Sequence, residues 1–146
     1  MRPMTKTRLL IRSALLAALL LVAIWPDAAA VAQEFQPYPS PKVTVEQWQE
    51  YLLEVRSRHE ASAEIYKDKN VVVFSDPTTR TFYIFTTKDH PAHPAWITRQ
   101  IVEEGGKVNV RQIGYFAGAQ QPFDRMFSEY LQLNEQLKHE VEQRNQ

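Results

Sequence analysis

Residues 71–87, VVVFSDPTTRTFYIFTT, contain two runs of β-branched and aromatic residues separated by Asp-Pro-Thr-Thr. Such runs are typical of β-strands, and the residues between them favour a turn. We therefore predict a hairpin of residues 71–75 and 80–87 in which Val73 pairs with Phe82. Both faces of this hairpin are apolar, which indicates that it lies in the middle of a covered sheet.

A second hairpin is predicted for residues 96–104 and 107–115. The Gly-Gly pair between these two runs favours a two-residue turn. Pairing Glu104 with Lys107 then sets the register of the whole hairpin. The face that carries Ile97 and Val110 is apolar, but Arg99 and Gln112 interrupt it; the opposite face mixes aromatic and polar side chains.

A helix is predicted on either side of the two hairpins. Thr44 begins the first with a capping box to Gln47, and the polar residues 67–70 end it. Its inner face consists of Val45, Trp48, Leu52, Val55, His59, Ser62 and Tyr66. Pro122 suits the first turn of the second helix. The inner face of that helix consists of Phe123, Phe127, Tyr130, Leu131, Asn134, Leu137 and Val141.

The predicted order of helix, four strands and helix places the chain in the α+β class. Two hairpins in series favour a four-stranded antiparallel meander with both helices packed on it. We expect a single domain over residues 44–142, followed by a frayed polar tail at residues 143–146.

The first 32 residues have the pattern of a secretory signal peptide. Four basic residues precede an apolar run at residues 14–25, and small residues follow at 28–32. The apolar run is shorter than the roughly 20 residues that a membrane-spanning helix needs. We expect cleavage after Ala32, or alternatively after Ala30, and a periplasmic or secreted protein without stable membrane insertion. An uncleaved anchor is the other interpretation.

Residues 33–43 follow the predicted cleavage site and form a proline-rich leader. Pro37, Pro39 and Pro41 occupy alternate positions in it. Alternating prolines favour an extended backbone exposed to solvent. We therefore predict an extended leader that is not part of the core. Docking of Phe35 and Tyr38 is the alternative.

Composition excludes several classes of protein. The 146 residues include no cysteine, so disulfides, thiolate zinc sites and cysteine nucleophiles are excluded. Lys and Arg together number 17, as do Asp and Glu. Because four of the basic residues lie in the predicted signal peptide, the remainder is slightly acidic. A nucleic-acid partner is therefore not expected.

Asp89, His90 and His93 form the one cluster of side chains suited to a metal. Pro91 and Pro94 bias the residues before them toward extended backbone, which separates the two imidazoles. We therefore interpret the segment as an extended connector and expect no metal and no other cofactor. A metal-dependent enzyme that uses this loop is the weakest alternative.

No nucleophile or phosphate-binding motif is present, so we predict that the chain is not an enzyme. His59 aligns with the apolar residues of the first predicted helix. This position favours a partly buried core histidine over a catalytic base.

The mixed face of the second hairpin is the candidate binding surface. If both helices pack on the apolar face, the exposed residues are Trp96, Gln100, Arg111, Ile113 and Tyr115. Aromatic residues beside arginine are typical of interface hot spots. We therefore predict a non-enzymatic protein that binds another protein or an envelope component through this face. The alternative is that a homodimer partner, the leader or the His-Pro loop covers this face.

A small-molecule carrier is the second functional hypothesis. Aromatic side chains occur on both faces of residues 80–87. A pocket between the sheet and Tyr66, Phe127 or Tyr130 would suit an apolar ligand.

Overall fold

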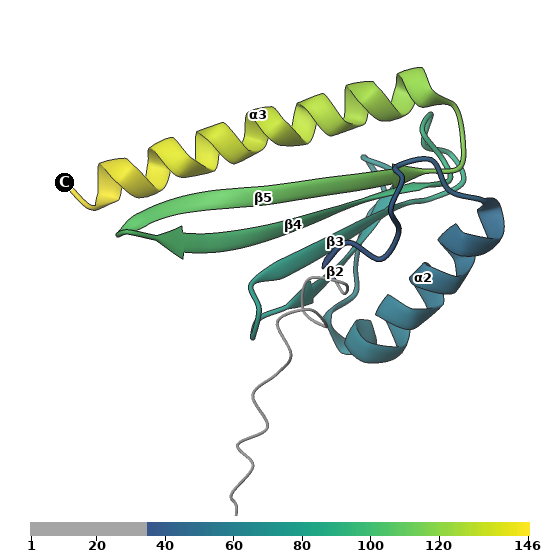
Figure 1. Cartoon of the computed structure of the whole chain (residues 1–146), viewed down its shortest axis with the longest axis horizontal. Helices are drawn as coiled ribbons and strands as arrows, with labels where there is room; N and C mark the ends of the chain where they lie inside the picture. Colours follow the sequence, from purple (N-terminus) through teal and green to yellow (C-terminus); the bar gives the residue numbers. More distant parts are fainter. Residues whose placement is uncertain (1–34) are drawn as a thin grey trace, which may run out of the picture.

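The computed structural model describes residues 35–146, and the predicted signal peptide lies outside them. The described residues form one antiparallel sheet of five strands with two long helices (Figure 1). The α+β class is therefore confirmed, but the predicted number of strands is wrong. In chain order the elements are α2 (Val45–His59), a 3₁₀ turn (Glu60–Ser62), β1 (Glu64–Tyr66), β2 (Val71–Asp76), β3 (Thr81–Thr86), β4 (Ala95–Glu104), β5 (Lys107–Phe116) and α3 (Gln120–Arg144).

The additional strand, β1, occupies residues that we predicted to continue the first helix. The helix ends at His59, where the Ser62 hydroxyl donates to the His59 carbonyl and accepts from the Ser75 N–H. Side-chain bonds of this kind compete with helical backbone bonds. A turn then reverses the chain at Asn70, whose φ of 54° suits asparagine, and β1 pairs with β2.

The β2–β3 hairpin forms, but its predicted register is wrong by two residues. Val73 pairs with Ile84 instead of Phe82. The strand extends to Asp76, whose carboxylate accepts from the Thr78 N–H and the Thr79 hydroxyl, so the loop begins one residue later than predicted. A shift of two residues leaves each side chain on its predicted face.

The β4–β5 hairpin has the predicted register. Glu104 pairs with Lys107, and Trp96 pairs with Tyr115. Gly105 and Gly106 both have positive φ, 59° and 77°, as a tight two-residue hairpin turn requires.

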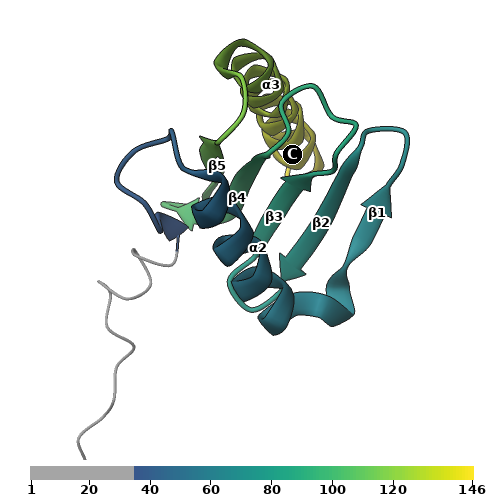
Figure 2. The ribbon, with the colours of Figure 1, turned by 90° about the vertical axis from the view of Figure 1, so that its right-hand side faces the viewer.

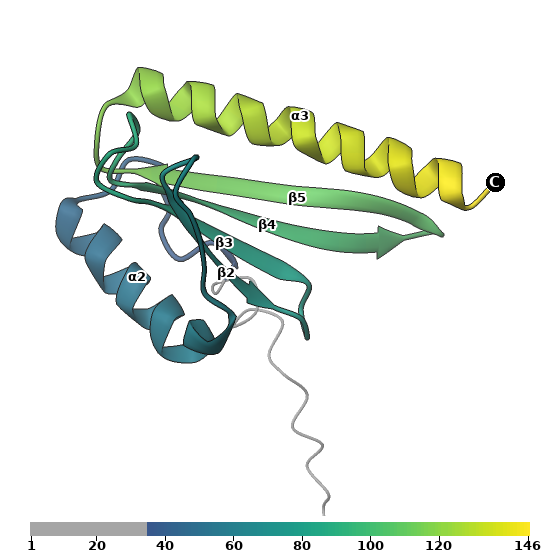
Figure 3. The same ribbon diagram turned by 180° about the vertical axis from the view of Figure 1, so that it is seen from behind.

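The two helices cover opposite faces of the sheet, as Figures 1 and 3 show. On one face, α2 packs Trp48, Tyr51 and Val55 against a cluster of aromatic side chains from β2 to β5. On the other face, α3 packs Phe123 and Met126 against the apolar side chains of the central strands. The expectation that both helices share one face is therefore wrong, because the aromatic face of β3 and β4 also requires cover.

The inner faces of both helices differ in part from the prediction. In α2, the capping box of Thr44 and Gln47 is present, but Val45 is 44% exposed and Tyr51 is buried in its place. In α3, Leu131 is 44% exposed and Met126 is buried. Both helices are rotated relative to the predicted apolar stripe.

The proline-rich leader is packed against the sheet, so the expectation of a solvated leader is wrong. The Tyr38 ring makes edge contacts with Tyr51, Trp96 and Tyr115, at centroid distances of 5.9 to 6.5 Å. The Tyr115 hydroxyl donates to the Tyr38 carbonyl at 2.8 Å. Four residues later the leader backbone joins the outer edge of β5 through a bridge between Lys42 and Phe116.

The Asp76 turn makes stability depend on pH. Burial acts to raise the pKa of Asp76, but hydrogen bonds from Thr79 and Thr78 outweigh it, and the pKa lies below the usual 3.8. Because the pKa of Asp76 is lower in the folded state than in the unfolded state, the ionised carboxylate stabilises the fold at pH values above 3.8. This stabilisation is lost as the pH falls through the folded-state pKa. We expect Asp76→Asn to lower the free energy of unfolding by about 1 kcal/mol at pH 7 and to change it very little near pH 2. Denaturant unfolding at both pH values measures this difference. A loss of equal size at both pH values would contradict this.

The docked leader predicts a second stability effect. Tyr38→Ala removes three ring contacts and should lower the free energy of unfolding by about 2 kcal/mol. The control Tyr66→Ala removes a tyrosine that is 40% exposed on the short strand β1, and we expect less than about 1 kcal/mol. Equal losses in denaturant titrations of the two variants would show that the leader does not stabilise the core.

Candidate functional site

The predicted aromatic-polar surface is not a continuous exposed face. Trp96 is 0% exposed and Tyr115 is 1% exposed, because α2 and the leader cover them. Trp96 stacks on Tyr115 at 4.6 Å and on Phe85 at 5.8 Å. The expectation that these two residues face outward is wrong, and they act in the core.

The other three predicted residues lie on the outer part of the β4–β5 hairpin. Arg111 is exposed, and its guanidinium lies 4.4 Å from the centre of the Phe35 ring. Gln100 is half-buried and accepts a hydrogen bond from Arg111 at 3.4 Å. Ile113 is half-buried and packs near the leader. Of the five predicted residues, two therefore lie in the core, and the other three are half-buried or exposed on the hairpin.

The His-Pro loop forms turns instead of the predicted extended connector. The His93 N–H donates to the His90 carbonyl, and the His90 N–H donates to the Thr87 carbonyl, both at 3.0 Å. These bonds satisfy backbone donors that an extended loop would leave to water. The physical reason that we gave for separate imidazoles is therefore wrong.

Both loop imidazoles are held by the protein. His93 Nδ1 lies 3.1 Å from the Thr86 carbonyl, and His90 Nδ1 accepts from the Ala92 N–H at 3.0 Å. Asp89 is exposed. Within residues 35–146, no three His, Asp or Glu side chains lie close enough together to hold a metal ion. That the chain binds no metal stays a prediction.

His59 lies at the end of α2, where it stacks on Tyr83 at 5.5 Å. The residue is partly buried, as predicted, but its Nε2 has no hydrogen-bond partner among the described residues. The stacking explains why an imidazole occupies an otherwise apolar helix face.

The outer edge of β5 presents backbone groups that are free to bind. Phe116 uses its outward N–H and carbonyl on the leader, donating to Pro41 and accepting from Val43. Outward and inward groups alternate along an edge strand, so the backbone at residues 114, 112, 110 and 108 also faces outward. Among residues 35–146, no backbone partner outside the hairpin bonds to these four positions.

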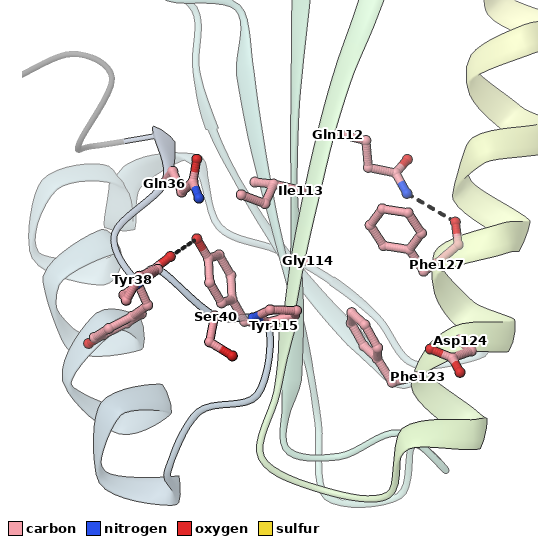
Figure 4. Close-up of a pocket in the computed structure, with 12 residues that line it drawn as sticks. Gln36, Tyr38, Ser40, Gln112, Ile113, Gly114, Tyr115, Phe123, Asp124 and Phe127 are labelled. Carbon is pink, nitrogen blue, oxygen red and sulfur yellow. Dashed lines mark hydrogen bonds between the residues drawn. The ribbon is translucent and has the colours of Figure 1, made fainter. Parts of the chain in front are cut away.

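A groove of about 380 Å³ lies along this edge, and we call it the edge groove (Figure 4). The leader forms one wall through Tyr38 and Pro39, and α3 forms the other through Phe123 and Phe127. The middle is β5 at residues 112–115. The free backbone of the strand therefore lies between two apolar walls.

Gly114 allows the α3 wall to lie close to the strand. A Cβ atom there would come within 2.7 Å of Phe123 and 2.9 Å of Phe127. Both rings therefore occupy space that a side chain at this position would take. The Gln112 side chain completes this wall by donating to the Phe127 carbonyl at 3.0 Å.

A polar network crosses the apolar interface between the sheet and α3. Arg99 Nε donates to Asn134 Oδ1 at 2.8 Å, and Asn134 Nδ2 donates to Gln112 Oε1 at 2.7 Å. Asn134 is buried, and the Arg99 guanidinium lies over the Tyr130 ring at 5.5 Å. Burial lowers the pKa of Arg99 below its ordinary value.

Two cavities flank Arg99 on the α3 side of the sheet. The larger, about 260 Å³, is lined by Arg99 together with Tyr66, Lys69, Val71, Val73, Phe82, Ile84, Tyr130 and Leu133. The smaller, about 230 Å³, is lined by Phe82, Arg99, Ile101, Val110 and Leu137. Figure 2 shows that β1 and β2 lie to one side of α3. Both strands contribute side chains to the larger cavity, Tyr66 from β1 and Val71 and Val73 from β2.

Neither the edge groove nor the Arg99 cavities are predicted by the sequence patterns. The only signal for either was the interruption of an apolar strand face by Arg99 and Gln112. The leader wall had no local signal, because Tyr38 contacts residues far along the chain. Neither helix described in residues 35–146 is both long and apolar enough to cross a membrane.

The chain matches no known family model, no curated protein and no solved structure. Its function therefore has to be inferred from the edge groove and the Arg99 cavities.

Proposed function

We propose that the chain is an exported, non-enzymatic binding protein that takes an extended segment of a partner protein as an added strand on β5. The observation that carries this proposal is a row of outward backbone groups, at residues 108, 110, 112 and 114, that have no backbone partner within residues 35–146. A peptide strand pairs with such groups, and this recognition is called β-augmentation.

The leader is a precedent for pairing at this edge. It already adds to the end of β5 through two backbone bonds at Phe116, of 2.9 and 3.0 Å. An incoming segment that continues along the same edge would place alternate side chains on the two sides of the strand. The edge groove offers apolar walls for a large apolar side chain beside Ile113 and Gly114.

Charge at the edge favours a partner segment that is not basic. Lys107 and Arg111 are both exposed on β5. Positive side chains on an edge strand oppose self-pairing, because two copies in an antiparallel pair bring them together. We therefore propose another protein as the partner, with pairing of two copies of this chain as the outcome that would replace it.

A second candidate function is carriage of a small molecule in the Arg99 cavities. Tyr66 and Tyr130, two of the three residues predicted to line a carrier pocket, both line the larger cavity. Phe127 lies in the edge groove instead.

The edge proposal predicts a backbone-dependent interaction. Octapeptides selected for binding to the purified protein should lose at least about tenfold in affinity for Val110→Pro, because the outward N–H of residue 110 disappears while the β4–β5 ladder keeps its bonds. The matched control Val110→Ala removes the side chain but keeps the N–H, so it should bind nearly as well as the unmodified chain. Circular dichroism of both variants checks that the fold is retained.

A second readout identifies the binding mode. Each backbone nitrogen of a bound peptide is methylated in turn. Methylation at every second position should abolish binding and methylation at the positions between should not, because only every second N–H of an added strand faces β5. Peptides that bind equally to Val110→Pro and Val110→Ala would contradict the proposal. So would a dimer in sedimentation equilibrium that Val110→Pro converts to a monomer.

A further inference from the structure

Arg99 is a half-buried cation without an acidic partner. Arg58 pairs with Glu54 and Arg80 pairs with Glu103, but no acidic side chain within residues 35–146 forms an ion pair with Arg99. Nε and Nη2 both donate to the neutral oxygen Asn134 Oδ1. A guanidinium has five N–H donors, so the Nη1 group has no acceptor among the described residues.

A cation in such a position is costly to retain. Removing a charge from water without a counter-charge destabilises a fold. Guanidinium remains protonated at neutral pH even when burial disfavours its charge. The Tyr130 ring and the Asn134 oxygen offset part of this cost, but neither neutralises the charge.

The two cavities beside Arg99 differ in chemistry. In the smaller, Arg99 is the only polar side chain, and the other four lining residues are apolar. In the larger, Lys69 provides a second positive charge, and the hydroxyls of Tyr66 and Tyr130 provide polar groups. The positive charges of the larger cavity suit an anionic group, and the apolar lining of the smaller cavity suits an apolar chain.

We propose that the Arg99 cavities bind a carboxylate attached to an unbranched apolar chain, such as a medium-chain fatty acid. The carboxylate accepts hydrogen bonds from Arg99 Nη1, and the chain lies along Ile101, Val110 and Leu137. This inference rests on the second candidate function, carriage of a small molecule, and is independent of peptide binding on β5.

Calorimetric titration with decanoate and with neutral decanol tests the inference. The unmodified protein should bind decanoate at least about tenfold more tightly than decanol, since a charged hydrogen bond forms only with the carboxylate. Arg99→Gln keeps a donor for Asn134. This variant should lower the affinity for decanoate about ten- to a hundredfold and leave the affinity for decanol unchanged. Arg99→Lys should retain more decanoate affinity than Arg99→Gln, and the control Arg111→Gln should have no effect.

A second pair of variants tests the position of the chain. Leu137→Trp fills part of the smaller cavity and should weaken both ligands, whereas Leu131→Trp on the exposed side of α3 should weaken neither. Equal binding of decanoate and decanol would overturn the carboxylate inference while leaving the carrier function in place. Binding of neither ligand to the folded protein would overturn both. Equal losses in Arg99→Gln and Arg111→Gln would also overturn the inference.

Discussion

The central strand β3 is apolar on both of its faces, and the rest of the structure depends on covering both. Tyr83 and Phe85 point to one side, and Phe82 and Ile84 point to the other. Residues 35–146 provide one long helix for each face, and α2 and α3 pack on opposite sides of the sheet (Figure 1). A single helix cannot cover all five strands, and the leader completes the cover over Trp96 and Tyr115. The same limit leaves the sheet open beside Arg99.

Both candidate binding regions are consequences of this incomplete cover. Within residues 35–146, the leader backbone bonds to the backbone of β5 only at Phe116, which leaves the outward backbone groups between residues 108 and 114 available. On the α3 side, the helix follows β5 and leaves part of β1–β3 uncovered (Figure 2). The network through Asn134 and Gln112 connects the two regions, because Gln112 contributes to the edge groove and Asn134 holds Arg99.

Local features of the fold were predictable because they depend on neighbouring residues. The capping box at Thr44 and the Gly-Gly turn each involve positions at most three residues apart. The β2–β3 register was harder to predict, because it depends on whether Asp76 ends the strand or begins the loop, and its side-chain bonds to Thr78 and Thr79 decide this. The side of the sheet that α2 covers depends on contacts between Tyr51 and Trp96, 45 positions apart, which no local pattern reports. For this reason, the prediction that Trp96 and Tyr115 form an exposed surface is wrong. The sequence indicated Arg99 only as a charged residue that interrupts an apolar strand face.

Amide hydrogen exchange followed by nuclear magnetic resonance tests most directly whether the outward edge of β5 is free. Val108, Val110, Gln112 and Gly114 should exchange at least about tenfold faster than Asn109, Arg111 and Ile113, because only the second group donates to β4. Phe116 should be protected, since its N–H donates to Pro41. Uniformly slow exchange along residues 108–114 would show that another part of the chain or a second copy already occupies the edge, and it would contradict the account.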